Sequence, residues 1–329
     1  MSVRTDADHG PTLARDRSGR SVLAVVFLLF FVFSYSEEAV FAVLEAIDHD
    51  TTLGWLIGLV GLDAAVLAVV GLLKRDITAA EGGVPRLWRP WWVAAGAVLG
   101  LDVVLCLLPE NHPLWLDLTF SVALAILMGL VMALSLNADP VTLLCGARRR
   151  AAPTDWMRMR AVVPLVVGTF VCYLAATAFD DFFDLDSQRT LDPDLAAEVD
   201  AMPLPQHLGA MATLCEGAVS PAFFYQVVAV IPLLLLTLGV EFNFFRRALA
   251  EPVQRAAAAA TVTVMSVGLV LALSTLPWAG TGCGQVLRYW HEFLAFVVSV
   301  QGLGTGLATL VWVLLVSDPD RRLTGADNG

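Results

Sequence analysis

The sequence contains little charge. Only 16% of its 329 residues are Asp, Glu, Lys or Arg, whereas 57% are hydrophobic. A soluble globular domain of ordinary composition carries about 25% charged residues, so this composition excludes that class. A soluble fold would also need several buried helices without a polar face, which globular proteins of this size rarely build. The composition therefore predicts an integral membrane protein.

Lysine is nearly absent, and so are the short motifs of common enzymes. Lys74 is the only lysine among 20 basic residues, a bias typical of a GC-rich bacterial genome. We find no phosphate-binding loop, no GxGxxG after a strand, no HExxH and no GxSxG. No arginine-rich span indicates a voltage sensor. We therefore expect no cofactor and no nucleic-acid partner, and the sequence favours a protein that is not an enzyme.

Eight apolar runs are long enough to cross a bilayer, which takes about 20 residues per helix. The predicted fold is all-α: a polytopic bundle of eight transmembrane helices embedded in the lipid bilayer. The first run could instead be a signal peptide cleaved after Ser36, because it follows a basic start and ends in small residues. The rest of the topology is the same in either case. The expected spans are 21–44, 52–73, 90–108, 114–136, 161–179, 222–245, 256–277 and 293–316.

The basic residues predict the orientation. They fall in alternate connections, and only Arg189 and Arg288 lie in the other set. Positive charge is retained on the cytoplasmic side of a membrane. We therefore expect both termini inside, in a bacterial cytoplasmic (plasma) membrane. Residues 1–20 and 317–329 would be cytoplasmic tails, the eight-span bundle would cover 21–316, and 180–221 would be the one substantial outer loop.

Carboxylates within the spans are the main candidates for chemistry. Asp63 falls near the middle of the second span, Asp102 in the outer half of the third, and Asp117 near the outer end of the fourth; Glu37 and Glu38 fall at the outer end of the first. No basic residue lies at a matching depth, so these groups must be protonated, face water or bind a cation. The sequence predicts a proton or cation site. The alternatives are a packing hydrogen bond for Asp63 and solvated helix ends for Asp117, Glu37 and Glu38.

Two polar residues stand out in the second half of the chain. Glu241 lies about one turn before Arg246–Arg247, so an ion pair there is the simpler alternative to a role in a cation site. Gln301 lies in mid-span beside Gly302, Gly304 and Gly306. Glycines at such spacing permit close helix approach, as do Gly54, Gly58 and Gly61, and the pair Gly96 and Gly100.

Histidines and cysteines suggest two further sites on the outer side. One histidine falls in each outer connection, and three of the four have acidic neighbours; they are His49, His112, His207 and His291. Imidazole and carboxylate together form a ligand set for zinc or another divalent ion, or an external pH sensor; loop histidines without a special role are the alternative. Cys215 and Cys283 are the two cysteines in outer connections, where disulfides are permitted, so they are a candidate pair.

One segment carries a resemblance. Residues 223–236 read FFYQVVAVIPLLLL and are followed by Glu241. The pattern is an aromatic pair and a Gln, followed by an apolar Pro-Leu run and a Glu. It resembles a segment of uncharacterised multi-pass actinobacterial membrane proteins. The resemblance covers about 20 residues. It implies kinship and no particular activity.

The function that these features favour is a cation- or proton-linked transporter or permease of small solutes, using Asp63 and Asp102. The alternative is a non-catalytic sensor or accessory subunit that responds to external pH or divalent ions. Protons or small cations would be the partners of either. A membrane-embedded enzyme comes third.

Overall fold

The computed structural model describes residues 10–46, 52–80, 87–108, 114–140, 153–182, 197–199, 201–207, 210, 219, 221–245, 251–276 and 286–316. All regular structure within these residues is helical, which confirms the all-α fold class. Eight helical segments are long and apolar enough to cross a membrane, as predicted. They are Ser18–Leu44, Leu53–Ala80, Trp88–Leu107, Trp115–Ser135, Arg158–Phe179, Ala222–Glu241, Pro252–Thr275 and Trp290–Leu314.

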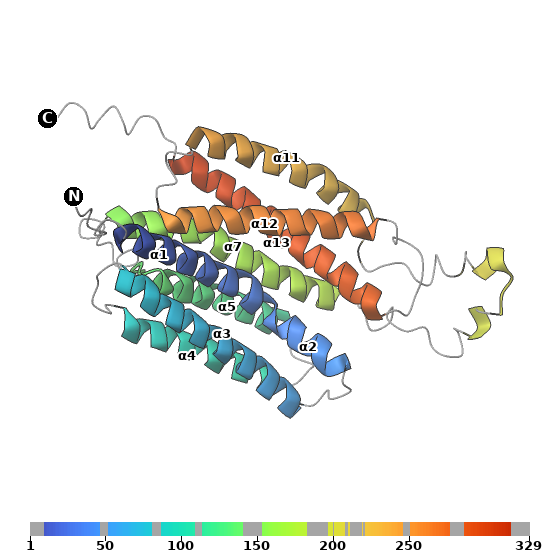
Figure 1. The fold of residues 1–329 in the computed structure, drawn as a ribbon. Helices are drawn as coiled ribbons and strands as arrows, with labels where there is room; N and C mark the ends of the chain where they lie inside the picture. The colour runs from blue at the N-terminus through green and yellow to red at the C-terminus, as the bar shows by residue number, and fades with distance from the viewer. Residues whose placement is uncertain are drawn as a thin grey trace, which may run out of the picture. The chain divides into compact units, whose positions relative to one another are not determined.

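Figure 1 shows the arrangement of the helices. In chain order they are α1 (Gly10–Phe27), η1 (Leu28–Val32), η2 (Phe33–Tyr35), α2 (Ser36–Ala46), α3 (Thr52–Ala80), α4 (Trp88–Leu107), α5 (Leu114–Ser135), α7 (Pro153–Phe182), α11 (Pro221–Phe245), α12 (Pro252–Thr275) and α13 (Val286–Val316).

The first span is not a regular α-helix. Between α1 and α2 the backbone widens to a π-helix in η1 and then tightens to a 3-10 helix in η2. Two serines bond back to the backbone here: Ser34 Oγ donates to Leu29 O at 3.5 Å, and Ser36 Oγ donates to Phe33 O at 2.9 Å. A π-helical turn inside a longer helix is uncommon and often accompanies a functional site.

The chain forms two compact units. Unit 1 comprises Met1–Thr169 and Arg246–Ala260, and unit 2 comprises Phe170–Phe245 and Thr261–Gly329. In unit 1, α1 and α2 pack on α3, α3 packs on α4, and α4 packs on α5 (Figure 1). The faces that meet are mostly apolar, and their fully buried side chains include Val25, Phe30, Trp91, Val98 and Val131.

Unit 2 is held together by close helix contacts and by aromatic rings. On α12, Gly268 approaches the backbone of Ser299 of α13, and Ser299 Oγ donates to Gly268 O at 3.2 Å. The hydroxyls of Thr261 and Thr309 meet at 3.0 Å between the same two helices. Phe179 of α7 packs edge-on against Phe293 of α13, with ring centroids 5.2 Å apart.

The glycines divide into two groups. A Cβ on Gly302 would lie 3.2 Å from the Met265 Cα, so this glycine allows the close approach that its spacing predicts. By contrast, Gly61, Gly96 and Gly100 are exposed and would meet nothing within 4 Å. These three glycines make no close helix approach, because these faces of α3 and α4 point away from their neighbours. Gly58, which shares its spacing with Gly61, does lie close to α2: a Cβ there would come 2.7 Å from Val40 Cγ1.

Candidate functional site

Helices α3 and α4 bring Asp63 and Asp102 together. The two carboxyl groups are close enough to hydrogen-bond, although they are 39 residues apart in the chain. Asp63 is 1% exposed and Asp102 is 3% exposed. Because α3 and α4 pack antiparallel through apolar faces, a residue in the first half of α3 is level with one near the end of α4. The two candidates from sequence thus form one buried pair.

Ser36 is the third member of this site. Its hydroxyl lies within hydrogen-bonding reach of the Asp63 carboxyl, and it is 3% exposed. Ser36 is the first residue of α2, directly after the irregular turns η1 and η2. The same hydroxyl also lies 2.9 Å from Phe33 O and donates to it. The distorted segment of the first span therefore positions one side of the site.

The hydrogen bonds of the pair require a proton or an ion. Two carboxyl groups can hydrogen-bond to one another only if one of them carries a proton, because an ionised carboxylate only accepts. Asp63 Oδ1 and Asp102 Oδ2 are buried and have no hydrogen-bond partner among the described residues. A buried carboxylate without a partner is costly. The arrangement therefore has one shared proton and two oxygens that can still accept a proton or a cation.

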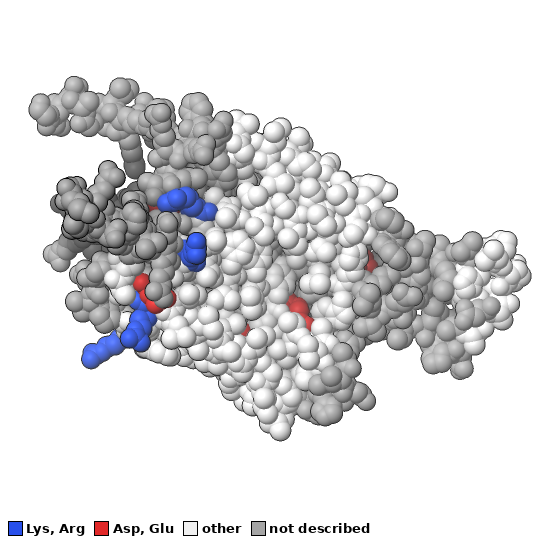
Figure 2. All heavy atoms as spheres, viewed as in Figure 1, with Lys and Arg blue, Asp and Glu red and all other residues white. Residues whose placement is uncertain are grey.

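Glu37 marks the exposed edge of the site. It follows Ser36 in α2, its side chain is exposed, and it interacts electrostatically with Asp102 and with the thiol of Cys106. Cys106 lies one turn beyond Asp102 on α4 and is half-buried. Figure 2 shows a few acidic residues among uncharged ones on the face in view, and the first turn of α2 holds Glu37 and Glu38. We call this edge of unit 1 the Glu37 end.

A second buried polar cluster, which the sequence reasoning missed, surrounds Lys74. The prediction treated Lys74–Arg75 as the end of the second span, but α3 continues to Ala80 and Lys74 is 1% exposed. Its ammonium group donates to Leu134 O and, at 2.9 Å, to Asn137 Oδ1. It also lies 5.8 Å from the centroid of the Trp88 ring. Lys74 is thus a buried cation at the end of α5, and we call this region the Lys74 end.

The end of α5 explains why a buried cation is stable there. Asn137 adopts a left-handed backbone conformation, with φ 56°. Ala138 N donates to Ala133 O at 2.9 Å and Asn137 N donates to Leu134 O at 3.2 Å, which is the Schellman pattern of a helix C-terminus. The carbonyl groups at such a terminus carry partial negative charge and favour a cation. The sequence signal was Lys74 itself, which lies on the same buried stripe of α3 as Asp63.

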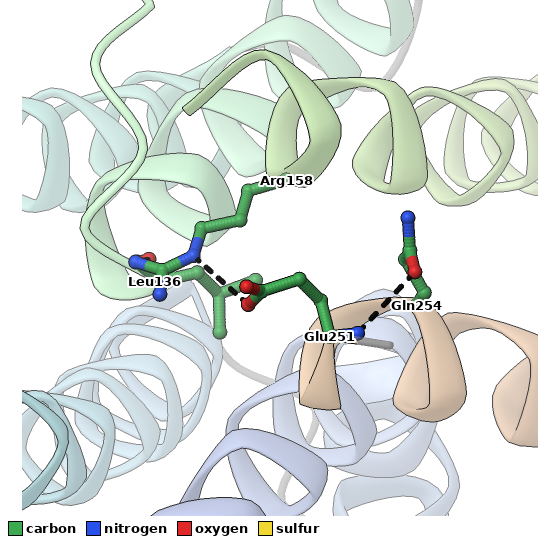
Figure 3. Close-up of polar contacts among 4 residues, drawn as sticks. All are labelled: Leu136, Arg158, Glu251 and Gln254. Atoms are coloured by element: carbon green, nitrogen blue, oxygen red, sulfur yellow. Dashed lines mark hydrogen bonds and ion pairs between the residues drawn. The ribbon is translucent and has the colours of Figure 1, made fainter. Parts of the chain in front are cut away.

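Arg158 adds a second cation at the same helix terminus. Its guanidinium donates to Leu136 O at 3.2 Å and pairs with the Glu251 carboxylate at 3.6 Å (Figure 3). Glu251 precedes α12, and its backbone N–H donates to Gln254 Oε1 at 3.4 Å. The Gln254 side chain thus forms one half of a capping box. Pro252 occupies the first helical position, where proline is favoured. Arg158 therefore connects the end of α5 with the beginnings of α7 and α12.

The basic side chains that the structure describes all belong to unit 1. They lie at the end of α3, at the start of the apolar stretch of α1, or at the beginnings of α4, α7 and α12. In Figure 2 the visible basic residues gather at one end of this unit. This clustering is what a positive-inside orientation requires. The cytoplasmic placement of both termini stays a prediction.

The other sequence candidates lie on α2, α5, α11 and α13. Asp117 is half-buried in the first turn of α5, where an acidic side chain suits a helix N-terminus. Glu38 is half-buried beside Glu37. Glu241 is half-buried in α11 and Gln301 is fully buried in α13, both in unit 2. Arg246 and Arg247, which are the proposed partners of Glu241, lie outside the described residues.

Of the four candidate histidines the structure describes two. His207 Nδ1 lies 3.0 Å from Val199 O, and His291 Nε2 lies 2.7 Å from Ser274 Oγ. His49 and His112 lie outside the described residues, as do Cys215 and Cys283 and hence the proposed disulfide. Over the described part of the chain, no group of three or more His, Cys, Asp or Glu side chains could hold a metal ion.

These observations define the class of the protein. Eight apolar helices long enough to span a bilayer make the chain a multi-pass integral membrane protein. No protein family, curated protein sequence or solved structure matches it. The resemblance of residues 223–241 to actinobacterial membrane proteins stays a prediction.

Proposed function

We propose that this protein is a transporter or permease of small solutes in a bacterial cytoplasmic membrane, and that a proton or a small cation drives it. The observation that carries the proposal is the buried pair of Asp63 and Asp102, held by two spans and by Ser36 of a third. Ionisable side chains inside transmembrane segments are expensive to bury and mark ion pathways in many membrane proteins.

The composition of the pair favours a monovalent ion. A divalent cation usually takes several charged or imidazole ligands from the protein, and the described residues offer no cluster of three. Two carboxyl groups that share one proton can exchange that proton, or accept a small monovalent cation in its place. Release of the proton changes the charge of the pair by one unit, and a monovalent cation that takes its place restores that charge. Both steps replace a hydrogen bond between the two carboxyl groups and hence change the contacts between α2, α3 and α4. Such a coupling between ion binding and helix packing is what ion-driven transport needs.

The test is ion flux in proteoliposomes. Vesicles with purified protein and an internal pH-sensitive dye receive a membrane potential, and proton and radioactive sodium uptake are measured in parallel. We expect the wild-type chain to exceed protein-free vesicles, and Asp63→Asn or Asp102→Asn to return the flux to that background. Asp76→Asn on the same helix is the matched control, because Asp76 lies about 20 Å along α3 from the pair, and it should retain the flux.

Two outcomes would contradict this proposal. One is wild-type flux equal to that of protein-free vesicles for both ions. The other is flux that persists in Asp63→Asn. Size-exclusion profiles and melting temperatures of each variant establish that a lost flux is not a lost fold.

A sensor or accessory subunit is the second candidate, and a contact in unit 2 favours it. His291 and Glu292 are adjacent on α13 and hold two different segments: His291 bonds Ser274 of α12 at 2.7 Å, and the Glu292 carboxylate accepts from Val219 N–H at 2.8 Å. Protonation of the imidazole would change the first contact. Two results together would favour the sensor. One is the absence of ion flux, and the other is a pH dependence of the melting temperature that disappears in His291→Gln.

A further inference from the structure

The first four spans, all in unit 1, carry buried polar side chains at two levels. At the level of the carboxyl pair lie Ser34 of the first span, Asp63, Asp102 and Ser121. At the other level lie Ser21, Lys74, the Trp91 indole N–H and Ser135. All of these residues are at least nine-tenths buried. The first level belongs to the Glu37 end of the unit and the second to the Lys74 end.

Between these levels each helix is entirely apolar on its buried side. The stretches 22–33, 64–73, 92–101 and 122–134 contain no charged, amide or hydroxyl side chain, and the one indole among them, that of Trp92, is exposed. Ten residues of helix correspond to about 15 Å. We call these stretches the apolar layer. Its buried side chains on α3 and α4 are Val66, Leu67, Val70, Ala94, Ala95 and Val98.

Trp91 closes the apolar layer at the Lys74 end. It is the largest of the fully buried side chains, and a Cβ on Gly71 would lie 3.1 Å from its ring atom Cη2, so the indole rests directly on the α3 backbone. Its Nε1 donates to Ser135 Oγ of α5 at 2.8 Å. One side chain thus bridges α3, α4 and α5. Directly beyond it lies the Lys74 ammonium group, over the neighbouring Trp88 ring.

The physical consequences for an ion at the carboxyl pair differ in the two directions. Towards the Glu37 end, the exposed Glu37 carboxylate interacts with Asp102, and an ionised group at this depth requires water around it. Towards the Lys74 end, an ion would cross about 15 Å of packed hydrocarbon without a hydrogen-bonding group and would then meet a buried ammonium group of like charge.

We propose that the Asp63–Asp102 pair exchanges its ion only through the Glu37 end, and that Trp91 seated on Gly71 is the seal that isolates the pair from the Lys74 end. This proposal rests on the proposed function for its meaning in transport: in the described conformation the buried pair lies next to the exposed Glu37, and Trp91 has to leave Gly71 before an ion can pass to the Lys74 end. The seal itself is a property of the structure that can be tested without any transported solute.

The first experiment measures passive proton leak in vesicles that carry an internal pH-sensitive dye. Trp91→Ala opens a cavity in the apolar layer that continues to the Lys74 end, so we expect a several-fold faster leak than in the wild-type chain. The leak should disappear again in the double variant Trp91→Ala/Asp63→Asn. Trp92→Ala is the matched control: its indole is 60% exposed against 0% for Trp91, and the substitution should leave the leak at the wild-type rate.

Three results would overturn the proposal. The first is a folded Trp91→Ala protein that leaks no faster than the wild-type chain. The second is an equal rise in Trp92→Ala, which would show a general disturbance of the bilayer contact. The third is a leak that is unaffected by Asp63→Asn, which would show that the pair is not on the route.

A second experiment covers the case in which Trp91→Ala does not fold. A charged, water-soluble thiol reagent is applied to Glu37→Cys and to Val70→Cys, and labelling of each site is followed by mass spectrometry. Val70→Cys changes little volume in the centre of the apolar layer. We expect rapid labelling of Glu37→Cys and none of Val70→Cys; comparable rates would show that water enters the layer and would refute the seal.

The two proposals fail separately. If the wild-type chain shows no ion flux but Trp91→Ala produces an Asp63-dependent leak, the seal is present and the transport function is wrong. If the wild-type flux depends on Asp63 and Val70→Cys is labelled freely, the transport function holds and the seal is wrong.

Discussion

Replacing Lys74 by methionine tests whether the buried cation stabilises the end of α5. Lys74→Met keeps the apolar stem of the side chain and removes the ammonium group. The variant loses two charge-assisted hydrogen bonds, one to Leu134 O and one to Asn137 Oδ1. Each such bond contributes about 1.5–3 kcal/mol.

The magnitude lies at the lower end of that range. Leu134 O retains a donor in Asn137 N–H at 3.2 Å, and the Asn137 amide keeps its bond from Nδ2 to the Thr78 hydroxyl at 3.3 Å. The two lost bonds then cost about 3 kcal/mol together. Removing the cost of burying an ammonium group offsets part of this loss. We expect Lys74→Met to lower the free energy of unfolding by roughly 2 kcal/mol.

The assay is the melting temperature of purified protein in detergent, read as the fraction that stays monodisperse after heating. Arg75→Met is the matched control, because Arg75 is the next residue of α3 and is exposed. An exposed substitution of this kind changes stability by less than about 0.5 kcal/mol. A Lys74→Met protein as stable as the wild-type chain, or an equal loss in Arg75→Met, would refute the reasoning.

Two further predictions concern single backbone positions. Asn137→Ala should melt at a lower temperature than Asn137→Gly, because alanine in a left-handed conformation costs about 1–2 kcal/mol and glycine does not; equal midpoints would show that only the lost amide matters. Gly302→Ala should destabilise unit 2 by about 1–3 kcal/mol, since the added Cβ would press on the Met265 backbone. In the control Gly239→Ala the added Cβ meets nothing within 4 Å, so this variant should gain up to about 1 kcal/mol of helix propensity. A Gly302→Ala midpoint at or above that of Gly239→Ala would contradict the close approach.

The Asp63–Asp102 pair shows how far sequence reasoning reaches at the candidate site. Both residues could be selected from the sequence because each interrupts an apolar run without a basic residue at its depth. Their contact could not be predicted, because it depends on which face of α3 turns towards α4. Ser36 was visible only as the possible end of a signal peptide. Its place beside Asp63 follows from the π-helical and 3-10 turns that precede it.

Lys74 is a residue whose environment differs from the one that its sequence context indicates. A lysine next to an arginine at the end of an apolar run is usually an interface cation, and the sequence indicated that role. The structure places its ammonium group on the carbonyl end of α5, because Asn137 ends that helix at the same depth as Lys74 of α3. The depth of one helix end relative to another helix is a tertiary property that no local pattern in α3 carries.

The sequence alone determined the number of spans and their apolar character, because the energy of crossing a bilayer depends on about 20 consecutive residues and hence on local composition. Only the tertiary structure decided which side of each helix is buried. Lipid chains and a helix interface are equally apolar, so hydrophobicity does not choose between them. For that reason Gly96 and Gly100 face away from the bundle while Gly302 is packed against Met265. For the same reason the pairing of Asp63 with Asp102, and the layer that separates them from Lys74, exist only in the packed bundle.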